Sequence, residues 1–172
     1  AVAYARKIHQ LVTYLDVCDG NMAEGSLRFD ANISVRRDNA IELGTRSEIK
    51  NLNSFRFLEQ AIEYEIERQI EALESGTSLI QDTRLFDPDK RETRQMRSKE
   101  TSTDYRYFPE PDLLPVELSE AFIQSVADGM PELPDERLAR YQTSLGLSKA
   151  DALLLSGDLH LAQFFDTVAN GV

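Results

Sequence analysis

The sequence SLRFDANISVR, residues 26–36, alternates strictly between apolar and polar side chains. A side-chain period of two predicts a half-buried strand over these residues. Its apolar side, which would pack on a core, consists of Leu27, Phe29, Ala31, Ile33 and Val35. Its polar side consists of Ser26, Arg28, Asp30, Asn32, Ser34 and Arg36. Guanidinium groups beside a carboxylate and a carboxamide are the mixture that a phosphate and magnesium site needs.

A second alternating stretch, Glu42–Lys50, follows turn-forming residues at 37–40. We expect the two strands to pair antiparallel. If their polar faces coincide, one surface carries Arg28, Asp30, Asn32, Arg46, Glu48 and Lys50. An ordinary solvated face of paired charges would show the same alternation, so periodicity alone does not separate a site from a surface.

The next segments predict a long helix and a hairpin. Residues 53–75 have helical spacing, with Asn53 or Ser54 as the cap and Gly76 after the end. The expected apolar stripe is Leu58, Ala61, Ile62, Ile66, Ile70 and Leu73. The opposite face, which we expect to be solvated, carries Glu59, Glu63, Glu67, Glu71 and Glu74. Strands at 78–86 and 92–98 would pair around the loop at 87–90.

The two ends of the chain read as helical. Residues 1–15 form an amphipathic pattern, and four short helices are expected near 119–128, 135–145, 149–155 and 159–169. Together these elements predict an α+β domain, a mainly antiparallel sheet with flanking helices, followed by a small all-α module. We expect the domains to be residues 1–117 and 118–172.

Composition excludes several classes of function. The 172 residues carry a formal net charge of −11, which argues against a generic nucleic-acid binder and gives no reason to expect DNA as a partner. No apolar run approaches the roughly 20 residues that span a bilayer. The single cysteine, Cys18, suits a reducing cytosol, so a cytoplasmic location is expected. No Ser–His or Cys–His arrangement, zinc-type spacing or phosphate-binding loop motif is recognisable.

Three long motifs carry a resemblance to a known family: residues 24–36 (EGSLRFDANISVR), 44–69 (GTRSEIKNLNSFRFLEQAIEYEIERQ) and 96–115 (MRSKETSTDYRYFPEPDLLP). They resemble the B subunit of the bacterial-type aspartyl/glutamyl-tRNA(Asn/Gln) amidotransferase. The likeness covers most of residues 1–118, and the rest is similar to the start of that family's helical domain. It implies an internal piece, containing the C-terminal part of the family's cradle-like catalytic domain and the start of its helical domain.

The resemblance implies a ligase that uses ATP and Mg²⁺. Such an enzyme phosphorylates the side chain of Glu or Asp mischarged on tRNA, forming Gln-tRNA(Gln) or Asn-tRNA(Asn) after ammonia displaces the phosphate. The implied partners are the glutaminase A subunit and the small C subunit of the amidotransferase, and mischarged Glu-tRNA(Gln) or Asp-tRNA(Asn). A non-catalytic module for tRNA docking or assembly of the complex is the alternative.

The resemblance also suggests roles for residues of this chain. Glu24 and Asp30 are candidate magnesium ligands, with Asn32 as a neutral oxygen ligand or an orienting group. Arg28, Arg46 and Lys50 are candidate clamps for phosphate, and Asn51 would assist them. Arg97 and Lys99 are candidate contacts to phosphate or to the tRNA 3′ end. Because the family has further ligands upstream of Ala1, the chain alone should be inactive and bind magnesium–ATP weakly.

Overall fold

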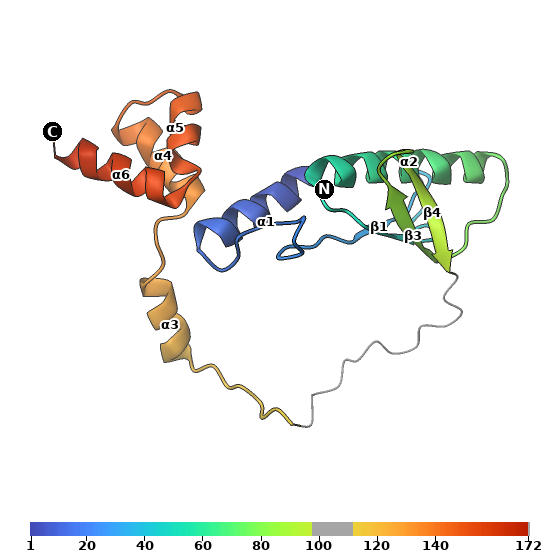
Figure 1. Ribbon diagram of the computed structural model, residues 1–172, viewed down its shortest axis with the longest axis horizontal. Helices are drawn as coiled ribbons and strands as arrows, with labels where there is room; N and C mark the ends of the chain where they lie inside the picture. Colours follow the sequence, from blue (N-terminus) through green and yellow to red (C-terminus); the bar gives the residue numbers. More distant parts are fainter. Residues whose placement is uncertain (98–111, 172) are drawn as a thin grey trace. The chain divides into compact units, whose positions relative to one another are not determined.

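A four-stranded sheet packed against one long helix forms the first part of the chain in the computed structural model (Figure 1). The structure describes residues 1–97 and 112–171. It divides into two units, Ala1–His9 with Cys18–Thr103 and Gln10–Val17 with Asp104–Val172. The expected division into sequence domains at residue 117 stays a prediction.

The sheet has the strand order β1-β2-β3-β4. Its strands are β1 (Ala31–Ile33), β2 (Ser47–Lys50), β3 (Asp82–Asp87) and β4 (Glu92–Arg97). The pairs β1/β2 and β3/β4 are antiparallel, whereas β2 and β3 are parallel. The parallel pair follows from the long crossover helix α2 (Phe55–Glu74), because parallel strands cannot be joined by a tight turn. The α+β class with a mainly antiparallel sheet is therefore confirmed.

The first two strands are shorter than expected from the alternation at 26–36 and 42–50. Ile33 and Ile49 still lie on the inner side, whereas Leu43, which precedes β2, is 78% exposed. Ile33 and Ile49 are buried in one core with Leu52, Leu58 and Phe86. The ladder stops after Ile33 because the backbone N–H of Val35 donates to Gln69 Oε1 at 3.0 Å, across 34 residues of sequence. The Gln69 side chain therefore supplies the acceptor that a neighbouring strand would otherwise provide.

Helix α2 follows its predicted limits but buries an unexpected face. Ser54 Oγ accepts the N–H of Phe57 at 3.1 Å, which confirms the N-cap. Leu58 and Ala61 are buried as expected. The expected apolar stripe is wrong further along, where Ile66, Ile70 and Leu73 are 37, 39 and 44% exposed. The glutamates at 59, 63, 67, 71 and 74 are exposed, as predicted.

Glu65 and Gln69 occupy the buried positions instead, and both are fully enclosed. Gln69 Nε2 donates to Ile33 O at 3.1 Å and to Glu65 Oε1 at 2.9 Å. The second oxygen of Glu65 accepts from Arg68 Nε at 3.0 Å and from Thr93 Oγ1 at 2.9 Å. The periodicity of apolar residues did not predict this burial. The buried face of the helix carries polar side chains whose hydrogen bonds are all made within the protein.

The second unit is helical. It contains α3 (Glu120–Asp128), α4 (Pro134–Ser144), α5 (Lys149–Ser156) and α6 (Leu159–Asn170), close to the predicted ranges. Residues 10–17 include the end of α1 (Val2–Tyr14). Tyr141 is fully buried and its hydroxyl donates to Ala162 O at 3.2 Å. Among the described residues, no helix is both long and apolar enough to cross a membrane.

Gly44→Ala should destabilise the first unit by at least about 2 kcal/mol, because overpacking forces the backbone to shift. An added Cβ at Gly44 would overlap the carbonyl oxygen of Val35, which cannot rotate away as a flexible side chain would. Chemical denaturation of the chain measures the loss. Gly129→Ala is the control, since its added Cβ would lie 3.5 Å from Ser125 O. Equal stability of the Gly44 variant and the wild type would contradict the close approach.

Acid should destabilise the wild type through Glu65. Burial raises the pKa of Glu65, but hydrogen bonds from Arg68 and Gln69 outweigh it and hold the pKa below its ordinary value of 4.5. The stabilisation is therefore complete above pH 4.5 and is lost as the pH falls through the folded-state value.

The test compares free energies of unfolding between pH 7 and pH 3 for the wild type and Glu65→Gln. The variant should be about 3 kcal/mol less stable at pH 7, because Arg68 and Arg84, both partly buried, lose the carboxylate that they share. It should also lose less stability on acidification. Glu67→Gln removes an exposed carboxylate from the same helix and controls for the change in net charge. Parallel pH curves for wild type and Glu65→Gln would refute the assignment.

Candidate functional site

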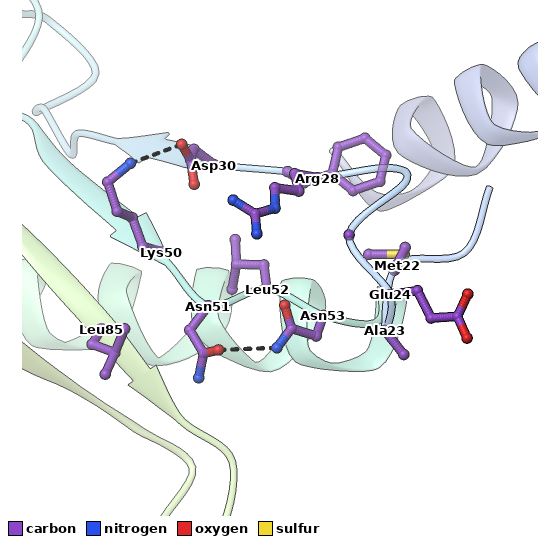
Figure 2. A pocket seen from close by; sticks show the side chains of 12 residues that line it. Met22, Ala23, Glu24, Arg28, Asp30, Lys50, Asn51, Leu52, Asn53 and Leu85 are labelled. Carbon is purple, nitrogen blue, oxygen red and sulfur yellow. Dashed lines mark hydrogen bonds and ion pairs between the residues drawn. The ribbon is translucent and has the colours of Figure 1, made fainter. Parts of the chain in front are cut away.

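A polar cavity of about 420 Å³ lies in the first unit, beside the end of β2 (Figure 2). Its walls come from the loop at 22–25, residues 28–30, residues 50–53 and Leu85 of β3. The cavity brings together five of the residues that the sequence singled out, namely Glu24, Arg28, Asp30, Lys50 and Asn51. Glu24 and Asn51, the first and last of these residues, are 27 positions apart in the sequence. The pairing of β1 with β2 brings the two ends of this stretch together.

Lys50 and Asp30 form an ion pair, with 2.9 Å between Nζ and Oδ2 (Figure 2). Lys50 Nζ also lies 3.2 Å from Glu48 Oε1. The other oxygen of Glu48 accepts from Thr83 Oγ1 at 3.0 Å, which ties the pair to β3. The hydrogen bond to Asp30 raises the pKa of Lys50 above its ordinary value. The ammonium group is therefore firmly charged and shared between two carboxylates.

Arg28 differs from Lys50 because its guanidinium makes no hydrogen bond or ion pair with any residue in the described ranges 1–97 and 112–171. It lies against Gly25, where an added Cβ would stand 3.5 Å from its Nε and Nη2. Figure 2 shows this side chain in the same part of the cavity as Asp30 and Leu52. An unpaired, permanently charged guanidinium offers a forked donor to a phosphate or carboxylate.

The loop that carries Glu24 is held by local hydrogen bonds. Asn21 Oδ1 accepts from the N–H groups of Ala23 and Glu24 at 3.1 and 3.2 Å. Cys18 Sγ accepts from Gly20 N and donates to Ser26 O, each at 3.3 Å. These bonds give the cysteine a structural place in the loop.

The carboxylates of Glu24 and Asp30 line one cavity without converging. Figure 2 shows the side chain of Glu24 pointing away from Asp30 and Lys50. Within the described part of the chain, no three His, Cys, Asp or Glu residues gather as a metal site. Magnesium commonly takes only one or two protein carboxylates together with phosphate oxygens. The oxygen donors at this cavity fit that requirement, and their role as ligands stays a prediction.

The remaining predicted residues lie elsewhere. Asn32 lines a separate cavity of about 480 Å³ between α1, β1 and α2, together with Asp30. Arg46 is exposed and lines neither cavity. Arg97 ends β4, but its side chain and Lys99 lie outside the described residues. The same holds for residues 98–111 of the third motif, at 96–115.

Sequence reasoning missed two features of the site. It placed Glu48 on the polar surface but gave it no role, although the alternation that aligned it with Lys50 was visible. It also missed Asn53, whose Nδ2 donates to Asn51 Oδ1 at 3.0 Å. Because Asn53 was treated only as a helix cap, no pattern in the sequence indicated this contact.

The profile of the GatB/GatE catalytic domain matches residues 1–124 of this chain, which include the sheet, α2 and the whole polar cavity. The chain therefore belongs to the GatB/GatE catalytic domain family. This result confirms the resemblance that the sequence motifs carry.

Relatives within the family agree with this assignment. The chain is 57% identical over 168 residues to the B subunit of the aspartyl/glutamyl-tRNA(Asn/Gln) amidotransferase of Thioalkalivibrio sulfidiphilus. It is 58% identical over 168 residues to the proteins of the same name from Alkalilimnicola ehrlichii and Nitrosospira multiformis. Each match covers 98% of this chain but only 34–35% of the relative. The chain thus spans about a third of the length of the curated relatives that it matches.

Proposed function

We propose that this chain is the part of a tRNA-dependent amidotransferase that activates the side-chain carboxylate of Glu or Asp carried on tRNA. The observation that carries the proposal is the cavity that Arg28 shares with the Lys50–Asp30 pair, since Arg28 has no hydrogen-bond or ion-pair partner within residues 1–97 and 112–171. Membership of the catalytic domain family supports the same reading. Of the polar surface expected from the two alternating stretches, Arg28, Asp30 and Lys50 line one cavity, whereas Asn32 does not.

The proposed reaction has two steps. An oxygen of the substrate carboxylate attacks the γ-phosphorus of ATP, giving an acyl phosphate and ADP. Ammonia then attacks the acyl carbon and inorganic phosphate leaves, so that an amide remains. Charge develops on phosphoryl oxygens in the first step, and fixed cationic donors stabilise it best in a site that excludes water.

Arg28 and Lys50 would supply these donors. Arg28 is free to form two parallel hydrogen bonds to phosphoryl oxygens. Lys50, which lines the same cavity, would add a second positive charge, and its ammonium group lies 3.2 Å from Glu48 Oε1. Mg²⁺, when bound, would supply neutralisation of phosphate charge. Asp30 is the residue that would hold it, and Glu24 would have to turn its side chain toward Asp30 to join it.

The wider assignments follow the family. The proposed partners are a glutaminase A subunit that delivers ammonia, a small C subunit, and mischarged Glu-tRNA(Gln) or Asp-tRNA(Asn). We place the enzyme in the cytoplasm, where translation uses its product. The cavity favours this catalytic function over a docking module, because a surface used only for docking has no need of an unpaired cation facing an ion pair.

Arg28→Ala and Asp30→Ala should each lower transamidation turnover by at least about 100-fold in the full amidotransferase complex. Arg28→Ala removes a donor to developing charge, which costs about 3–4 kcal/mol of transition-state stabilisation. Asp30→Ala removes the carboxylate that holds the Lys50 ammonium at 2.9 Å. The measurement is amide formation on mischarged tRNA with ATP and glutamine. Arg37→Ala, an exposed arginine outside the cavity, is the control. Near-normal turnover in both cavity variants, with melting temperatures unchanged, would remove this cavity from the chemistry.

The chain by itself should bind magnesium–ATP only weakly, with a Kd of about 1 mM or about −4 kcal/mol. Asp30 is already neutralised by Lys50, so a cation must displace an ammonium group held at 2.9 Å. Titration calorimetry measures the affinity, and Lys50→Gln shows whether the ammonium blocks magnesium added without nucleotide. Tight, stoichiometric binding to the wild-type chain would mean that these residues already form a complete site.

A further inference from the structure

Asn51, at the edge of the cavity, has a backbone conformation that few residues adopt. Its φ is +68°, and only Asp16 and Arg91 share a positive φ among the non-glycine residues that the structure describes. A left-handed conformation costs a residue with a Cβ about 1–2 kcal/mol, although asparagine tolerates it better than most. Something in the surroundings must therefore hold Asn51 in this conformation.

The side chain of Asn51 makes the contact that holds this turn. β2 pairs with β3 up to Lys50, which is opposite Leu85. At the next position the backbone leaves the sheet, and Asn51 Nδ2 donates instead to the carbonyl oxygen of Phe86 at 3.0 Å. Phe86 is fully buried in the core. The carboxamide thus continues the parallel ladder for one more bond while the backbone turns away.

The other end of the same carboxamide acts on the segment that follows. Asn51 Oδ1 accepts from Asn53 Nδ2 at 3.0 Å, as Figure 2 shows. Leu52 between them is buried in the core, and Ser54 caps α2 directly afterwards. Both polar ends of the Asn51 carboxamide are therefore engaged by the protein. Lys50 is left as the last residue of the strand, with its ammonium at Asp30.

We infer that Asn51 is a positioning residue, not a phosphate ligand. Its carboxamide links β3 to the segment that begins α2, and so fixes the direction from which Lys50 and Asn53 enter the cavity. This inference rests on the proposed function, since it names what aligns the site. It assigns Asn51 a different task from the phosphate contact suggested by the sequence resemblance.

The variants Asn51→Gly, Asn51→Ala and Asn51→Asp separate the backbone from the carboxamide. Glycine keeps the positive φ without strain but removes both hydrogen bonds. Alanine removes the bonds and retains the strain. Aspartate keeps an acceptor for Asn53 but places a carboxylate oxygen against Phe86 O. Arg91→Gly is the control, because it relieves a positive φ of 54° at a residue that does not line the cavity.

Three measurements apply to each variant in the full complex: kcat with its KM for ATP, the melting temperature, and a crystal structure of the cavity. Asn51→Gly should melt close to the wild type, yet its kcat should fall about 10–100-fold, the effect of a small misplacement in an active site. The KM for ATP should change far less than kcat. In the crystal structure, Lys50 Nζ should lie beyond hydrogen-bond distance of Asp30. Asn51→Asp should resemble the glycine variant, and Arg91→Gly the wild type.

Three results would overturn the inference. Wild-type kcat in Asn51→Gly would show that the carboxamide aligns nothing. Activity that falls in step with the melting temperature across the series, including an unfolded glycine variant, would make the residue merely structural. A raised KM for ATP that is far worse with aspartate than with glycine would indicate a direct phosphate contact.

Failure of the proposed function gives a different pattern. In that case Arg28→Ala and Asp30→Ala keep wild-type turnover. Failure of the positioning role alone leaves those two variants inactive while Asn51→Gly stays active.

Discussion

The fully buried carboxylate of Glu65 is the group on which the first unit depends. It lies between α2 and the sheet and is satisfied by Arg68, Gln69 and Thr93. Arg84 approaches the same carboxylate at 3.4 Å and donates to Thr93 Oγ1 at 2.8 Å, so β3 and β4 are both joined to the helix. A buried charge that loses its partners is strongly destabilising, and this cluster therefore ties helix and sheet into one arrangement.

The polar cavity inherits its geometry from that arrangement. Gln69 holds the chain just after β1, while β2 is fixed between β1 and β3. Asp30 precedes β1 and Lys50 ends β2, so their meeting at 2.9 Å is set by the register Ala31↔Ile49. A shift of this register by one residue would turn Lys50 to the other face and separate the pair. The site thus results from the pairing of β1 with β2, which α2 stabilises through Gln69.

The sequence predicted those parts of the fold and site that depend on local periodicity. Alternation at 26–36 and 42–50 correctly placed Asp30, Asn32, Glu48 and Lys50 on one face, because side-chain direction along a strand depends only on position. The cap at Ser54 and the exposed glutamates of α2 were predictable for the same reason.

Features that depend on distant residues could not be predicted in this way. The early end of β1 requires Gln69, which lies 34 residues beyond Val35. Burial of Glu65 requires Thr93, which lies 28 residues further along the chain. The left-handed turn at Asn51 requires Phe86. That Arg28 has no partner in the described part of the chain can be seen only when all its neighbours are in place. None of these long-range contacts produces a periodic pattern in the sequence.

The carboxamide of Gln69 also affects how the sheet meets other polypeptides. An edge strand offers a row of peptide groups that can recruit a foreign strand and start aggregation. Here the carbonyl of Ile33 and the N–H of Val35 are already bonded to the Gln69 carboxamide. These two peptide groups therefore cannot pair with a foreign strand. The opposite edge, β4, carries Arg94 in ion pairs with Asp87 and Glu92, and a charged edge is likewise a poor template. The satisfied peptide groups at the end of β1 and the charged side chains of β4 thus both make intermolecular β-pairing less favourable.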